Sequence, residues 1–148
     1  MDLKFPESYH QASFLFETQG TQAYASVCER CGPDVAGVLL VAHLRRQFGS
    51  MKDFPAPPEC ETQTNRELLL SFPHLKWEKI EQFYSAARVI ERDASHGYGE
   101  LVASHGRLIA DTLLVDHLRW RCNWLGFKPE EYTESVNRYI SENIFAIR

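Results

Sequence analysis

The sequence predicts an all-α protein, an irregular single-domain bundle of about five to seven helices with one long central helix from Tyr98 to Leu125. Two observations support this fold class. Apolar residues recur at spacings of three, four and seven through most of the chain, as in helices that bury one face. Residues typical of helix starts and ends flank these segments. A chain of 148 residues also fits one domain, which we expect to cover residues 1–148.

Three helices are expected before residue 50. Each carries apolar residues at helical spacing, and the breaks between them fall at Gly20 and at the pair Gly32 and Pro33. The third segment is apolar on nearly every side, so we expect it to be buried. Its middle would also suit a buried strand, but its helix start at Asp34 and its basic end favour a helix.

A proline-rich segment, residues 50–63, is expected to form an ordered surface loop. Pro55, Pro57 and Pro58 favour extended backbone and interrupt a helix. Because the segment is longer than most connections between helices, it is a candidate contact site for a partner, centred on Phe54. Thr64 then begins a capping-box pattern, which predicts the start of the next helix.

The second half of the chain predicts three long helices. Residues 74–93 have the most regular amphipathic pattern, and the central helix follows. Gly97 is expected to provide a tight turn that makes these two helices an antiparallel hairpin. Gly126 ends the central helix, and Pro129 begins the last one, whose buried face is expected to run from Tyr132 to Phe145.

One line of the central helix changes from apolar to polar along its length. Its polar members share a narrow sector of the helical wheel: His105, Thr112, Asp116, Arg119 and Asn123. We expect this line to be solvated, because charged side chains are rarely buried unless they are paired. The alternative is that the helix stays central and the polar line faces an internal cleft.

Four cysteines are the strongest candidates for metal chemistry. Cys28 and Cys31 have the Cys-x-x-Cys spacing of zinc ligands, and Cys60 and Cys122 could complete a tetrahedral site. We expect cysteines of the core instead, because Cys28 and Cys31 already fall on an apolar helical stripe. No cofactor is favoured, and a helical domain that binds zinc or iron through cysteines or a histidine is the alternative function.

Other function classes find no support in the sequence. It contains no nucleophile elbow, Walker loop or dinucleotide-binding glycine motif, so we expect a protein without catalytic residues. The net charge of −4, with its signs well mixed, makes nucleic acid an unfavourable main partner. We see neither a secretion signal nor an apolar run that could span a membrane, so we expect a cytoplasmic protein.

The candidate binding surface is an aromatic ridge at the end of the central helix. Trp120, Trp124 and Phe127 recur at helical spacing beside Arg119 and Arg121, and aromatic residues with arginine are typical of interaction hot spots. One alternative is that the last helix covers this ridge. If the ridge is uncovered, the sequence predicts a non-catalytic regulator, adaptor or inhibitor that binds another protein through the ridge and the proline-rich loop. A homo-oligomer is compatible with the same surface.

Overall fold

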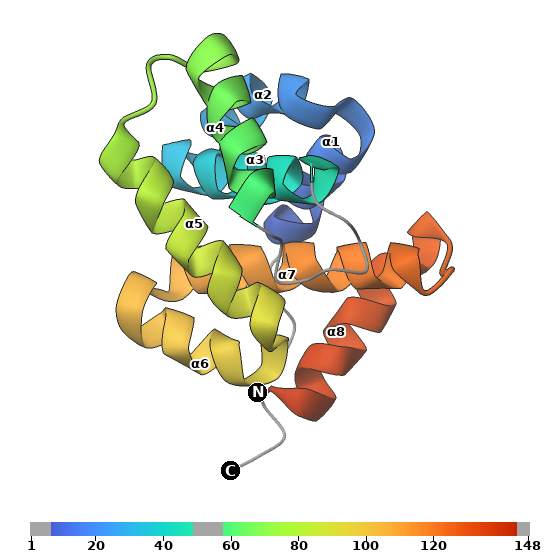
Figure 1. Ribbon diagram of the computed structural model, residues 1–148. Coiled ribbons are helices and arrows are strands. Elements are labelled where there is room, and N and C mark those ends of the chain that lie inside the picture. The colour runs from blue at the N-terminus through green and yellow to red at the C-terminus, as the bar shows by residue number, and fades with distance from the viewer. Residues whose placement is uncertain (1–6, 49–57, 145–148) are drawn as a thin grey trace.

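The computed structural model describes residues 7–48 and 58–144, the side chains of residues 58–61 excepted, and confirms the predicted all-α bundle within these ranges (Figure 1). The α-helices are α1 (Glu7–Gln19), α2 (Tyr24–Cys31), α3 (Pro33–Phe48), α4 (Pro58–Ser71), α5 (Trp77–Arg92), α6 (Ala94–His105), α7 (Arg107–Trp124) and α8 (Tyr132–Asn143). Two short 3-10 helices, η1 (Gly20–Ala23) and η2 (Pro129–Glu131), precede α2 and α8. Over the described ranges, no helix combines the length and apolar character needed to cross a membrane.

Helix α7 lies at the centre of the bundle, where it runs below α3 in the view of Figure 1. It packs against α1, α3, α5, α6 and α8, and the buried apolar side chains of the described residues form one continuous core. Helix α3 is the other deeply buried element. Every residue from Val35 to Ala42 on it is buried, which confirms the prediction made from its apolar sequence.

The predicted central helix from Tyr98 to Leu125 is divided in two at Gly106, which corrects the continuous helix expected from the sequence. Gly106 has a φ of 90°, and its N–H donates to the carbonyl oxygens of Leu101 and Val102 at 3.2 and 3.1 Å. This left-handed conformation ends α6, and glycine adopts it without steric cost. The chain then turns, and α6 packs against the start of α7 instead of extending it.

The hairpin between α5 and α6 is present, but its turn is at Asp93 and not at the predicted Gly97. The Asp93 carboxylate accepts the backbone N–H groups of Ser95 and His96 at 3.1 and 3.2 Å, which caps the start of α6. Gly97 lies within α6 and faces α5. A Cβ atom at this position would lie 2.8 Å from the carbonyl oxygen of Val89, so the glycine permits the close approach of the two helices.

Helix α4 begins earlier than the sequence suggested. It starts at Pro58, so the end of the predicted loop 50–63 is helical, and proline is well tolerated in the first turn of a helix. Thr64 is buried within α4 and does not begin it, contrary to the capping-box prediction. Phe54 lies outside the described residues, and so does the side chain of Cys60.

Candidate functional site

The end of α7 exposes large apolar side chains. Trp124 is 55% exposed, Leu125 57% and Phe127 43%. Helix α8 packs against α7, where Tyr132 contacts Asn123 and Arg119, but it leaves the three apolar side chains accessible. Of the predicted ridge, Trp124 and Phe127 are therefore uncovered by the described residues, whereas Trp120 is half-buried. We call Trp124, Leu125 and Phe127, with the exposed Arg121, the aromatic end.

A Schellman motif explains why Phe127 remains beside the helix end. Gly126 has a φ of 91° and donates its N–H to the carbonyl oxygen of Asn123 at 3.1 Å. The N–H of Phe127 donates to the carbonyl oxygen of Cys122 at 3.0 Å. These two bonds satisfy carbonyl groups of the last turn of α7 and hold the backbone of Phe127 next to that turn. The aromatic end is thus fixed by backbone geometry.

A surface hollow of about 330 Å³ adjoins the aromatic end. Trp120 and Trp124 line it, together with Tyr139 of α8 and Arg92 at the end of α5. The guanidinium of Arg121 lies over the ring of Tyr139, with its carbon 5.9 Å from the ring centroid. This contact places a positive charge at the edge of an aromatic surface, where it can meet an acidic group.

Arg119, predicted as a binding residue, is separated from this surface. Its side chain is 4% exposed, and its Nε and Nη2 atoms donate to the two carboxylate oxygens of Glu17 on α1 at 2.8 and 2.9 Å. Its Nη1 donates to Nδ1 of His10 at 3.1 Å, and Nε2 of His10 then donates to Asn137 at 3.2 Å. Burial, followed by the charge of Arg119, lowers the pKa of His10. Arg119 therefore joins α1, α7 and α8 as an internal residue.

Asp116 forms a second buried polar centre on α7. Its Oδ1 accepts the hydroxyl of Ser13 at 2.6 Å, and its Oδ2 accepts Nη2 of Arg46 on α3, also at 2.6 Å. With Thr112 and Arg119, Asp116 is buried, so the solvated interpretation of the polar line is wrong for these three residues. Each charge is paired, which is the condition under which burial is tolerated.

The other two members of the predicted polar line do not belong to this buried centre. His105 precedes the break at Gly106 and lies on α6, so the helical wheel of α7 does not include it. Asn123 is an exposed residue, although its side-chain oxygen accepts the hydroxyl of Tyr132 at 3.1 Å. The alternative of an internal cleft thus applies to Thr112, Asp116 and Arg119, which are buried, whereas Asn123 at the end of the line is exposed to solvent.

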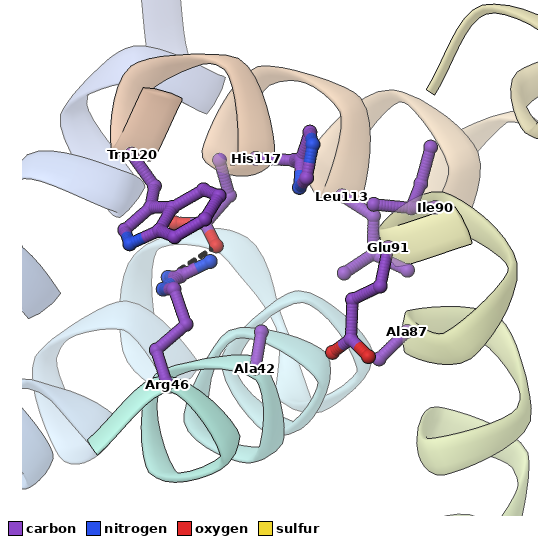
Figure 2. Close-up of a pocket in the computed structure, with 9 residues that line it drawn as sticks. Ala42, Arg46, Ala87, Ile90, Glu91, Leu113, His117 and Trp120 are labelled. Carbon is purple, nitrogen blue, oxygen red and sulfur yellow. Dashed lines mark hydrogen bonds and ion pairs between the residues drawn. The ribbon is translucent and has the colours of Figure 1, made fainter. Parts of the chain in front are cut away.

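Asp116 and Arg119 lie beside a cleft of about 740 Å³ between α1, α3 and α7. The cleft meets a second, water-sized cavity of about 10 Å³ at Arg46, Asp116 and Trp120. Figure 2 shows the small cavity, with Arg46 bonded to Asp116 beneath the indole of Trp120. Glu91 approaches it from α5, and Arg45 holds both oxygens of this carboxylate at 2.8 Å.

His117 lines both the small cavity and the surface hollow near the aromatic end. Burial, followed by the positive charges of Arg46 and Arg121, lowers the pKa of His117 to about 4. Its ring contacts Trp120, with centroids 5.5 Å apart. His117 is therefore neutral near pH 7, and its protonation at lower pH would place a charge in the interior.

The polar residues of α1 and α3 that meet α7 were not predicted from the sequence. His10, Ser13 and Glu17 are spaced by three and four residues, so they share one face of α1 and form a polar line opposite that of α7. This periodicity was available in the sequence. For Arg46, the sequence indicated only a basic residue in the last turn of a helix, and it did not indicate a buried ion pair.

The three cysteines whose side chains are described lie in the core or pack against it. Cys28 and Cys31 lie on one face of α2 and pack against the hydrophobic cluster, and Cys122 is buried on α7. In the described part of the chain, no group of three histidine, cysteine or acidic residues is arranged to hold a metal ion. Burial is the main cause of a raised pKa at Cys122. The structure thus describes three of the four predicted cysteine ligands, and it does not bring these three together as a metal group.

Comparisons with known proteins do not add a family to this description. No protein-family model, no curated protein and no solved structure matches the chain. A functional assignment therefore depends on the surfaces and cavities of this fold.

Proposed function

We propose that this chain is a non-catalytic protein that binds another protein, as a regulator, adaptor or inhibitor, through the aromatic end of α7. The supporting observation is the joint exposure of Trp124, Leu125 and Phe127 next to Arg121. Exposed apolar side chains that are contiguous and rimmed by polar groups are typical of protein interaction sites. Tryptophan and arginine are also the residue types most enriched among binding hot spots.

Contacts within the chain hold the backbone of the aromatic end and the guanidinium of Arg121. The Schellman motif holds Phe127 through backbone hydrogen bonds, and Tyr139 supports the guanidinium of Arg121. A surface that is ordered in the free protein loses little conformational entropy on association. We therefore place the main contacts at Trp124 and Phe127, together with Trp120, which lines the adjoining hollow.

The charges around the aromatic end favour an acidic partner surface. Arg92 and Arg121 line the adjacent hollow, and neither forms an ion pair with a described residue. The hollow also contains acidic residues, but Glu91 is bonded to Arg45, and Asp93 caps α6. An apolar anchor flanked by acidic residues would complement this arrangement.

Phe54 in the proline-rich segment is a further proposed contact.

The proposal can be tested by site-specific photo-crosslinking in the cells that make the protein. A benzophenone amino acid replaces Trp124 in one sample and Leu70 of α4 in the control, because Leu70 is 73% exposed away from α7. We expect a protein that crosslinks from position 124 only. A crosslink to a second copy of the chain alone would identify a homo-oligomer surface and overturn the proposed partner.

The captured protein is then purified, and its affinity is measured for Trp124→Ala and for Leu70→Ala. Truncation of a hot-spot tryptophan costs about 2 kcal/mol of binding free energy, or roughly a 30-fold loss of affinity. Leu70→Ala should bind as the unchanged protein does. Equal affinity of the two variants would refute the placement of the site at the aromatic end.

A further inference from the structure

The cleft between α1, α3 and α7 has the dimensions of a small-molecule site. Neither Trp124 nor Phe127 lines it, although Trp120 lines both the cleft and the hollow beside the aromatic end. Its volume of about 740 Å³ lies within the usual range for ligand pockets. It is lined by rings from α1, α3, α7 and α8, namely Phe14, Phe16, His43, Trp120 and Tyr132. A flat, apolar body would contact these walls better than a chain of hydrated groups would.

The acceptors of the cleft are already in use. Asp116 accepts Ser13 and Arg46 on its two oxygens, and Glu17 accepts Arg119 on both of its oxygens. A bound molecule therefore finds few free acceptors among the charged groups of the described residues.

The donors of the cleft are not all in use. Nη2 of Arg46 donates to Asp116, and the Arg46 side chain is 19% exposed. Among the described residues, the other N–H groups of its planar fork have no acceptor. His43 forms no hydrogen bond with another residue of the described ranges, and it contacts Phe16 with ring centroids 6.2 Å apart. Burial, followed by the charge of Arg46, lowers the pKa of His43, so near pH 7 the ring keeps one N–H donor and one free acceptor nitrogen.

An excess of unused hydrogen-bond donors over unused acceptors among the charged side chains of the cleft favours a ligand that accepts hydrogen bonds. We infer that the cleft binds a small aromatic acid, whose acid group accepts hydrogen bonds from Arg46 and whose ring packs against the aromatic walls. Asp116 neutralises much of the charge of Arg46, so the acid group is held mainly by directed N–H donors. The acid group should consequently increase the affinity of the ligand only moderately, on the order of tenfold.

Two fluorescent probes separate the acid from the ring. 1-Anilinonaphthalene-8-sulfonate carries an acid group, and N-phenyl-1-naphthylamine has the same aromatic body without it. Titration of the folded protein should show one site for each probe, with the sulfonate bound about tenfold more tightly. Equal affinity for the two probes, or no binding of the sulfonate, would overturn the inference.

Three variants locate the probe. Arg46→Lys keeps a positive charge beside Asp116 but removes the guanidinium fork, so we expect a loss of about tenfold for the sulfonate and less than twofold for the uncharged probe. Arg30→Lys on α2 is the matched control and should change neither affinity, because Arg30 is exposed and does not line the cleft. Phe14→Ala, at a wall residue that is 47% exposed, should weaken both probes.

Trp124→Ala distinguishes this site from the aromatic end. Because Trp124 does not line the cleft, the variant should bind both probes as the unchanged protein does. Loss of sulfonate binding in Trp124→Ala would place the dye at the aromatic end and refute the cleft site. Urea unfolding of each variant checks that its fold is intact, and Phe14→Ala still tests the site if Arg46→Lys is unfolded.

Discussion

The middle and the end of α7 distribute polar and apolar side chains in opposite ways. In the middle, Asp116 and Arg119 are buried and paired with residues of α1 and α3. At the end, Trp124 and Phe127 are exposed, and the neighbouring Arg121 forms no ion pair with a described residue. The comparison shows that hydrophobicity alone does not locate the surface of this protein. The middle holds the helices in place, and the end is available to a partner.

The largest expected effect comes from breaking the buried polar centre. Asp116→Leu removes the carboxylate partner of Arg46 and leaves the Ser13 hydroxyl only its longer bond to Glu17 at 3.5 Å. Loss of one partner from a buried ion pair costs about 3 kcal/mol or more. We expect a loss of this size in the free energy of unfolding, measured with urea. The double variant Arg46→Met with Asp116→Leu should recover part of it, because no unpaired charge remains. An unfolding free energy unchanged by Asp116→Leu would show that the middle of α7 does not depend on this pairing.

Acid should destabilise the same region through His117. Its pKa is about 4 in the folded protein, below the ordinary value of 6.5, so the unfolded chain binds the proton more readily. Stability should therefore be complete above pH 6.5 and fall as the pH decreases toward 4, by about 3 kcal/mol in total. Urea unfolding at several pH values measures this slope.

The control for acid destabilisation is His117→Gln, which removes the titrating group. Its stability should change less with pH over the same interval. Some slope will persist, because burial also lowers the pKa values of His10 and His43. Identical slopes for His117→Gln and the unchanged protein would contradict the assignment to His117.

A smaller effect is expected from the backbone that shapes the aromatic end. Gly126→Ala forces a residue with a Cβ atom to adopt a φ of 91°, which costs about 1–2 kcal/mol. Thermal unfolding measures this loss, and partner affinity should fall as Phe127 moves. Gly99→Ala on α6 is the control, since a Cβ atom there meets no other group and the helix gains stability. A Gly126→Ala protein as stable as the Gly99→Ala control would argue against the Schellman motif.

The smallest change in stability is expected from Trp124→Ala. The side chain is 55% exposed, so its removal should alter the free energy of unfolding by less than about 0.5 kcal/mol. Together with the loss expected for Asp116→Leu, this result would mean that a buried charged residue contributes more to folding stability than the exposed tryptophan does. A large loss of stability in Trp124→Ala would mean that the aromatic end belongs to the core.

Much of the fold could be predicted because helix formation follows local patterns. The apolar spacing of α3 predicted its burial, and the helical spacing of the aromatic ridge brought Trp120, Trp124 and Arg121 together at the end of α7. The exact breaks were harder to predict. Gly97 and Gly106 each end the same tetrapeptide, Ala-Ser-His-Gly, so the local sequence does not distinguish them. Only Gly106 has a left-handed φ and ends a helix, whereas Gly97 lies within α6 and packs closely against Val89.

By itself, the sequence determined the all-α class and which residues share a face of each helix, since both depend on neighbours three or four positions apart. The tertiary structure alone decided which faces are buried. Asp116 meets Ser13 and Arg46, which are 103 and 70 positions away in the chain. A charged side chain is stable in the interior only when such partners are in place, and the helical wheel of α7 contains no information about them.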